Sequence, residues 1–448
     1  MDQAIYDPQL LKQGVRRLTT GYDYPGPHQG NFCSNGIITP DRRPTAKLSE
    51  VKAAHQWVKF GPLKITDDCL LVPLRNAYDF TSLGDFKLSY EITADGNTVA
   101  QEAFLLPAVA PGDSTVIKIP SAPAPQDSEQ LLTLRILRNS SAPGIPAGHC
   151  EALHQYSITQ PRALPPLTAD KPKGKKHRFT DRPDCKQLQW GDVDMEFDPV
   201  TSTLTRFAIN GRDYIADGRG PEFDNHRWIE NDRFTDTSTG LDSIGAIDFA
   251  TEHNTAIVTT RRQGTLADRE ITYRVYPQGI VDVEVTIIPK SGNLRRAGVS
   301  LALDSALNQI DYIAHGPFEN SNDRLDGAPV GRYTSAAVAM AEHYVKPQST
   351  GNREGLRYAA LTDSTGNGLE ITAEGNVNFS LLPWTDEDLM NAQHEWQLTP
   401  RPYNTMHIDG AMRGVGNASC GHDVDTLPQY RVPSTPITYR FRIKELIR

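Results

Sequence analysis

The feature that most constrains the fold is an alternation of apolar and polar residues that recurs along the chain. Residues 86–92 place Phe, Leu, Tyr and Ile at every second position, and the same period of two appears at 132–136, 271–275, 281–287 and 437–443. Successive side chains of a β-strand point to opposite faces, so this period is typical of antiparallel strands with one buried face. The sequence therefore predicts a mainly β protein.

Two segments break the alternation and predict short helices. Residues 45–59 place apolar side chains three or four positions apart, from Leu48 to Val58. Residues 385–394 open with Thr385, followed by three acidic residues. A threonine cap with acidic residues in the first turn suits a helix N-terminus, because the helix dipole favours negative charge there.

Composition excludes several classes of protein. The 448 residues carry a formal net charge of −9, which disfavours binding to nucleic acid or to an anionic membrane. We find no run of about 20 apolar residues for a membrane span, and the N-terminal MDQAIYDPQL has no signal-peptide pattern. Five cysteines without paired spacing predict a reducing, cytoplasmic setting rather than a disulfide framework.

One seam divides the chain by composition. Residues 161–184 are rich in proline and contain a basic run, Lys171 to Arg178, with little apolar periodicity. A basic run can indicate nucleic-acid binding, but in an acidic chain it is more typical of a solvated linker. We interpret it as a linker between two β domains, with a softer seam near residues 60–62.

The N-terminal part carries a distinctive motif. Residues 21–44 form a Gly-, Pro- and Asn-rich stretch ahead of the first predicted helix, which is typical of a binding loop. The stretch resembles a signature of family 2 glycoside hydrolases of the large bacterial β-galactosidase type. The matching residues are Gly21, Asp23, Tyr24, Pro27, Phe32-Cys33-Ser34-Asn35-Gly36, Asp41-Arg42, Pro44, Leu48, Glu50 and Lys52.

Further motifs of the same family follow in order. Residues 312–324 resemble G-x-G-P-x-E-N-Y-x-D-R, and residues 344–353 resemble Y-x-x-P-Q-E-x-G-N-R, with Ser349 in place of the usual Glu. Residues 227–233 and 414–421 also have counterparts. The resemblance implies a remnant of the (β/α)8 barrel end, an immunoglobulin-like β-sandwich and a galactose-mutarotase-like β-supersandwich. We expect these three at 1–59, 60–162 and 183–448, with the linker at 163–182.

The same resemblance implies that the chain lacks the catalytic pair. Residues 1–3 resemble the middle of a late barrel strand, and the family's acid and nucleophile glutamates lie upstream of it, as do its magnesium ligands. Retaining hydrolysis needs two carboxyl groups about 5 Å apart across the glycosidic bond. We expect the C-terminal part of an enzyme that cleaves terminal β-D-galactose from β-galactosides. Its partner would be the missing catalytic part or further copies of itself.

Five residues become candidates for the sugar site through the resemblance. Phe32 and Asn35 match positions that give a backbone carbonyl and a side-chain oxygen to sodium, and such hard oxygen ligands suit this ion. His28 and Gln29 fall where the family's loop faces the sugar. Cys420 occupies the position at which many members of the family have a tryptophan that stacks on the sugar. Each has a plain structural alternative: loop-stabilising residues, exposed polar side chains and a partly buried thiol.

Two polar clusters leave other functions open. An epimerase-like enzyme would use His315 and Glu319 as acid and base. The structural alternative is a Gly-Pro turn that is held by hydrogen bonds and an Arg–carboxylate pair, formed with Asn320, Asp323 and Arg324. A second cluster offers a carboxylate pair for catalysis, or else a network paired with arginines: Glu222, Asp224, Glu230 and Asp232 around Arg227 and Arg233. A stand-alone carbohydrate-binding module is the third alternative.

Overall fold

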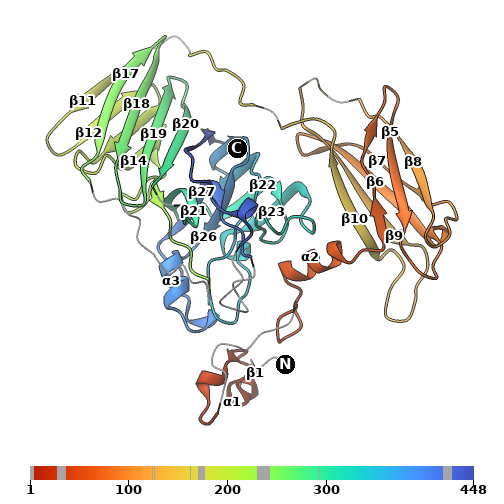
Figure 1. Ribbon diagram of the computed structural model, residues 1–448. Helices are drawn as coiled ribbons and strands as arrows, with labels where there is room; N and C mark the ends of the chain where they lie inside the picture. The colour runs from red at the N-terminus through yellow and green to blue at the C-terminus, as the bar shows by residue number, and fades with distance from the viewer. Residues whose placement is uncertain are drawn as a thin grey trace. The chain divides into compact units, whose positions relative to one another are not determined.

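The structure, a computed structural model, describes residues 5–27, 37–123, 125, 127–161, 163–169, 177–229, 243–290, 292–416 and 426–448. Its chain forms two compact units (Figure 1). The large unit comprises Met1–Thr45, Ala163–Asp323 and Tyr333–Arg448, and the small unit comprises Ala46–Arg162 and Arg324–Arg332. Both are built mainly from antiparallel strands, as the alternation predicts. None of the helices in the described ranges is long and apolar enough to span a membrane.

The small unit packs two sheets around one apolar core. One sheet has the order β10-β9-β6-β7, with bounds Cys150–Ser157, Gln130–Arg138, Phe86–Ala94 and Asn97–Leu105. In the other, β5 (Cys69–Asn76) pairs with β3 (Val58–Phe60), β4 (Lys64–Ile65) and β8 (Ser114–Pro120). Strand β6 confirms the predicted alternation, because its apolar residues Phe86, Leu88, Tyr90 and Ile92 are all buried.

The helix predicted over residues 45–59 ends earlier than expected. Helix α2 spans Ala46–Ala54, and Val58 lies in strand β3, where it is fully buried. The prediction was wrong here because the spacing that continues the helical pattern also fits a strand. Val58 and Phe60 face the core and pair with Asn76 and Leu74 of β5, so sheet formation decides the conformation.

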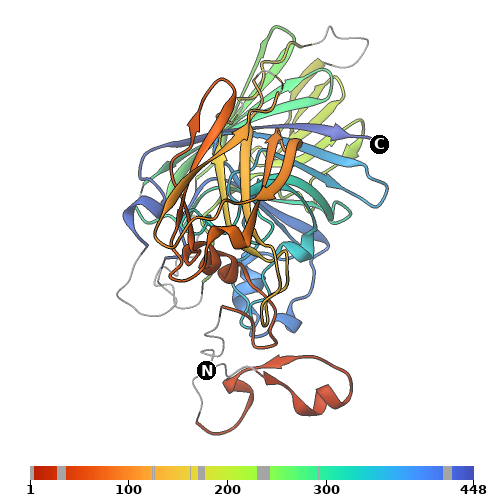
Figure 2. The same ribbon diagram turned by 90° about the vertical axis from the view of Figure 1, so that its right-hand side faces the viewer.

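The large unit contains a nine-stranded antiparallel sheet that runs β17-β18-β19-β20-β28-β25-β24-β22-β23. Its strands span Ala246–Glu252, Thr255–Arg262, Ala267–Tyr276, Ile280–Pro289, Ile437–Leu446, Gly368–Glu374, Tyr358–Thr362, Gln309–His315 and Val330–Ala336. The final strand β28 lies in the middle of this sheet, between β20 and β25 (Figure 2). The last residues of the chain therefore hold the two halves of the sheet together.

Two further sheets complete the large unit. One runs β16-β21-β27-β26 over Glu222–Asp224, Arg296–Asp304, Tyr403–Met412 and Asn378–Leu382. The other runs β11-β12-β13-β14-β15 over His177–Asp181, Lys186–Trp190, Val193–Phe197, Leu204–Ile209 and Arg212–Asp213. A short pair, β1 (Ile5–Tyr6) and β2 (Leu18–Thr19), flanks helix α1 (Pro8–Lys12). Helix α3 spans Asp386–Asn391, and Thr385 caps it as predicted, accepting from the N–H of Asp388.

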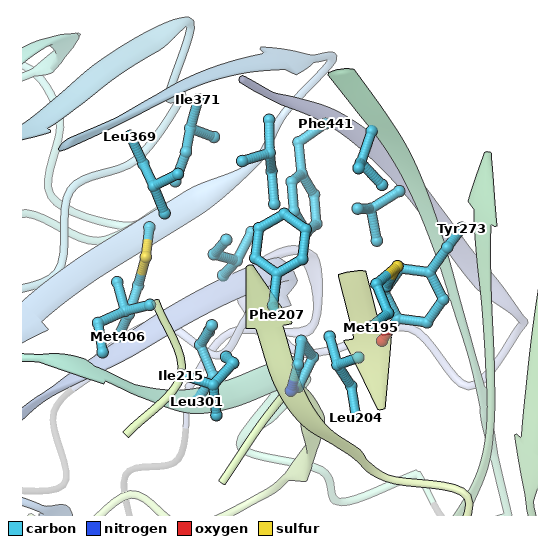
Figure 3. A pocket seen from close by; sticks show the side chains of 16 residues that line it. Met195, Leu204, Phe207, Ile215, Tyr273, Leu301, Leu369, Ile371, Met406 and Phe441 are labelled. Atoms are coloured by element: carbon cyan, nitrogen blue, oxygen red, sulfur yellow. The ribbon is translucent and has the colours of Figure 1, made fainter. Parts of the chain in front are cut away.

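The three larger sheets share one hydrophobic core. Figure 3 shows its centre, where Phe207 of β14, Tyr273 of β19, Leu369 of β25, Met406 of β27 and Phe441 of β28 converge. They surround a void of about 30 Å³ with an entirely apolar lining. A void of that character stays dry, so it is a packing defect rather than a ligand site.

The two units do not coincide with the expected domains. Helix α2 groups with the small unit, and so does the 324–332 segment, where Glu50 of α2 accepts from the N–H of Gly327 at 2.9 Å. Residues 163–169 belong to the large unit, where Arg442 donates to the carbonyl of Pro165 at 3.0 Å. The expected domain boundaries stay predictions.

A glycine in β21 gives a test of this packing. Gly298 lies opposite Asp409 of β27, and a Cβ there would come within 2.4 Å of the Asp409 Cα. We expect Gly298→Ala to lower the free energy of unfolding by about 1–3 kcal/mol, since neither central strand can move away. Gly292→Ala is the control, because its Cβ would meet nothing within 4 Å. Urea denaturation measures both; equal stability would contradict this close approach.

Candidate functional site

The five residues predicted to form the sugar site lie outside the described residues: His28, Gln29, Phe32, Asn35 and Cys420. Their roles therefore stay predictions. Three described segments flank them: 18–24 and 37–45 on either side of the first group, and 413–416 before Cys420. The structure places all three segments in the large unit. How these segments are held determines where the predicted residues can be carried.

The 37–45 segment is a tight turn organised by one carboxylate. Asp41 accepts from the hydroxyl of Thr39 at 2.5 Å, from Tyr6 at 2.8 Å and from Nε of Arg43 at 2.9 Å. Burial alone would raise the pKa of Asp41, but these hydrogen bonds outweigh burial and lower it. An isolated bridge between Ile38 and Pro44 closes the turn. The Asp41 carboxylate thus fixes the 37–45 segment, which follows the first group of predicted residues.

The 18–24 segment is held by two aromatic residues from the C-terminal part. His394 contacts Asp23 with Nε2 and Oδ1 2.9 Å apart, and the indole N–H of Trp396 donates to the carbonyl of Leu18 at 3.3 Å. The two rings stack with centroids 4.9 Å apart, and the guanidinium of Arg17 lies 4.6 Å from the centre of the Trp396 ring. These contacts join residues more than 370 positions apart in sequence.

The 413–416 segment is held by a third carboxylate. Asp323 accepts from the N–H groups of Val415 at 3.1 Å and Gly416 at 2.7 Å. Gly414 leaves no room for a side chain, because a Cβ there would lie 2.5 Å from Cγ of Asp323. Residues 416 and 426 lie side by side, since a Cβ on Gly416 would be 3.0 Å from the Cα of Thr426. Residues 416 and 426, which border the 417–425 stretch, are therefore held next to each other, and we call this pair and residues 413–415 the base of that stretch.

The 316–323 loop, which contains Asp323, is itself built around buried polar side chains. Asn320 donates to the carbonyls of His315 and Phe318, and its Oδ1 accepts from the N–H of Glu354 at 2.7 Å. Glu319 accepts from the hydroxyls of Tyr344 and Thr350 and from the N–H of Gly351. Both side chains are more than nine-tenths buried. Buried polar groups need such partners, so the loop has one well-defined conformation.

These contacts favour the structural interpretation of the 315–324 cluster. The carboxylate of Glu319 is occupied by three loop-forming donors, so it is poorly suited to exchange a proton with a sugar as an epimerase acid or base. Asp323 likewise accepts from two backbone groups and Ser321. Arg324 falls in the 324–332 segment of the small unit.

The second predicted cluster separates. Glu222 accepts from Arg269 at 2.9 and 3.2 Å and from Thr203 at 2.6 Å, while Arg262 lies 3.5 Å away. Glu222 is therefore paired with arginines, but with Arg269 and Arg262 rather than with the predicted Arg227. Arg227 instead donates to the carbonyls of Arg413 and Gly414, beneath the 413–416 segment. Glu230, Asp232 and Arg233 lie outside the described residues.

A buried ionic network that the sequence did not reveal lies in the same sheet. Arg296 of β21 donates to Nδ1 of His407, whose Nε2 lies 3.1 Å from Asp386. Although burial would raise it, Arg296 and His407 hold the pKa of Asp386 well below its ordinary value. Ser349, which replaces the Glu of the motif that residues 344–353 resemble, also donates to Asp386. A glutamate at position 349 would place its carboxylate beside that of Asp386, and the two would repel each other. The neutral serine avoids this repulsion.

Two more buried acids border this network. Burial raises the pKa of Asp409, and Arg296, 3.9 Å away, opposes the shift. Burial also raises the pKa of Glu354 to about 8; the hydrogen bond from Asn352 opposes this, and the carboxyl groups of Asp409 and Asp323 add to it. In the described part of the chain, no three His, Cys, Asp or Glu side chains are arranged to hold a metal ion.

Comparison with known proteins adds the family. The sequence model of the beta galactosidase small chain matches residues 189–443, and that of beta-galactosidase domain 4 matches residues 72–159. A beta-galactosidase of Actinobacillus pleuropneumoniae is 27% identical over 438 residues, covering 93% of this chain and 41% of that protein. One of Streptococcus thermophilus is 26% identical, with the same two coverages. The chain thus spans about two fifths of the length of these relatives.

Solved structures give weaker likenesses. A galactose 1-epimerase from Lactobacillus acidophilus aligns with 61% of this chain and 99% of its own, with a TM-score of 0.35 and 10% identity. A putative aldose 1-epimerase from Escherichia coli covers 58% of this chain and 98% of its own, with a TM-score of 0.34 and 9% identity.

The raised pKa of Glu354 can be tested through the pH dependence of stability. The folded chain keeps this carboxyl protonated up to about pH 8, whereas the unfolded chain releases the proton above its ordinary pKa of 4.5. The free energy of unfolding should therefore fall as pH rises from about 5 to 8, by at most about 1.4 kcal/mol per pH unit. We expect Glu354→Gln to make this slope shallower and to melt above the wild type at pH 8, while the raised pKa of Asp409 leaves part of the slope in place.

Melting temperatures measured from pH 5 to 8 check this expectation. Glu252→Gln, at an exposed position in β17, is the control and should follow the wild-type profile. A Glu354→Gln profile parallel to that of the wild type would mean that Glu354 ionises normally in the folded chain.

Proposed function

Because the chain belongs to the β-galactosidase small-chain family, we propose that it forms the C-terminal part of a β-galactosidase that releases terminal β-D-galactose from β-galactosides. The observation that carries the proposal is the family match over residues 189–443. In addition, relatives named beta-galactosidase align with 93% of this chain. In this proposal the acid and nucleophile glutamates belong to the part of the enzyme that these relatives have beyond the matched region.

The chain's own contribution is to carry two segments to the sugar. The described segments on either side of residues 28–36 are held by Asp23 and Asp41, and the segment that precedes residues 417–425 is held by Asp323. The 316–323 loop supports the second of these directly. Fixed supports of this kind limit the entropy lost when a binding segment is ordered around its ligand.

The predicted residues then take these roles. His28, Gln29 and Asn35 contact the galactosyl unit from one stretch, and Cys420 contacts it from the other. The carbonyl of Phe32 and the side-chain oxygen of Asn35 would hold a sodium ion, which their hard oxygen donors suit. Magnesium belongs to the remainder of the enzyme. We further propose a cytoplasmic enzyme, with that remainder and further copies of the chain as partners.

A chimeric enzyme tests the proposal. The matched C-terminal region of the Actinobacillus pleuropneumoniae relative is replaced by this chain, and hydrolysis of a chromogenic β-galactoside is measured. We expect the chimera to hydrolyse the substrate, whereas the relative truncated before that region and this chain by itself should not. In the chimera, Asp323→Ala should raise KM about tenfold, because the base of the 417–425 stretch loses a charged acceptor.

The control variant is Asp248→Ala, at an exposed position of the edge strand β17, which should leave KM unchanged. A chimera that folds, as judged by its melting curve, but hydrolyses no faster than the truncated relative would contradict the proposal.

A further inference from the structure

A cavity in the large unit lies beside the 37–45 segment and the 316–323 loop. Its volume is about 380 Å³, within the range usual for small-molecule sites. Its aromatic, hydroxyl-bearing and charged lining includes Thr39, Arg43, Phe318, Thr334, Ser335 and His343, together with Glu319, Glu342 and Arg353.

The aromatic ring of Phe318 remains 38% exposed at this cavity. Its backbone is fixed from below, because the Phe318 carbonyl accepts from Asn320 at 3.1 Å and that of Pro317 accepts from the Tyr312 hydroxyl at 3.3 Å. Glu319, the next residue, is buried and bound by its three donors. The loop therefore presents a partly exposed aromatic side chain to the cavity from a fixed backbone. A rigid ring in a concave site loses little entropy when a ligand packs on it.

Two of the charged side chains around the cavity, Arg43 and His343, are paired with acids of the protein. Arg43 pairs with Asp41 at 2.9 Å. The hydrogen bond with Glu395 raises the pKa of His343, and the Glu395 carboxylate balances the charge of the protonated ring. Ser335 donates to the carbonyl of Ala336, which leaves its oxygen able to accept, and Thr334 is exposed. The cavity therefore offers a ligand an aromatic side chain, hydroxyl groups, the outer edge of the Arg43 guanidinium and the acid side chain of Glu342. That set suits a neutral, hydroxyl-rich molecule better than an ion.

We propose that this cavity binds a neutral hexopyranose, with the C–H face of the sugar on the ring of Phe318 and its hydroxyls on Thr334, Ser335 and Arg43. A pyranose has one face of C–H groups and a rim of hydroxyls, which matches this division of the lining. The site lies within the large unit and needs no residue of the catalytic part. It goes beyond the proposed function, because the chain would bind this sugar whether or not it completes an enzyme.

The test is a titration of the full chain with methyl β-D-galactopyranoside and methyl β-D-glucopyranoside, followed by saturation-transfer NMR and calorimetry. We expect saturable binding of at least one glycoside. Phe318→Ala should weaken it about tenfold, the loss expected for a well-placed aromatic contact. Thr334→Val, which keeps the shape and removes the hydroxyl, should weaken it severalfold. Val338→Ala is the control, since this side chain is 49% exposed and outside the lining.

Melting curves confirm that each variant is folded before its affinity is compared. No saturable binding of either glycoside overturns the inference. Affinity that is unchanged in both Phe318→Ala and Thr334→Val, or that falls equally in Val338→Ala, overturns it as well, because the sugar would then bind elsewhere or nonspecifically. The outcome is independent of the chimeric enzyme: binding here with an inactive chimera leaves this inference standing, and an active chimera without binding removes it.

Discussion

The buried polar side chains of the 316–323 loop are the constraint on which the rest of the site depends. Glu319 and Asn320 bind the backbone and hydroxyls of residues 344–354, and Asp323 binds the backbone of 413–416. A buried polar group that loses its partner costs about 1–3 kcal/mol, more when it is charged. One eight-residue loop therefore fixes two segments that are distant in sequence.

The ionic network next to this loop has a different role. Asp386 begins α3, and its contacts with His407 and Ser349 attach that helix to β27 and to the 349–353 stretch. Pairs of this kind seldom add much net stability, because desolvation offsets the attraction between the charges. Removing one partner is nevertheless costly, so the network favours a single arrangement of α3 on the sheet.

The sequence predicted the β architecture but not the buried ionic network around Arg296, for a physical reason. Strands such as β6 and β20 have one wet face, so their alternation could be read directly. Strand β27 is buried on both faces over most of its length, and His407 and Asp409 lie within it. Polar residues in such a strand give no periodic signal, so the network around Arg296 could not be predicted. The helix cap at Thr385 could be predicted because it depends only on residues next to it in the sequence. The pairing of Asp23 with His394 could not, because only the fold brings these residues together.

The central claim is that the C-terminal chain brings the 28–36 and 417–425 stretches to one sugar. The most direct measurement is a crystal structure of the chimeric enzyme with a β-galactoside bound beside its catalytic glutamates. The account predicts that residues of both stretches contact the galactosyl unit, with Asp323 still bonded to the backbone of Val415 and Gly416. A galactosyl unit bound at the glutamates with neither stretch in contact would contradict it.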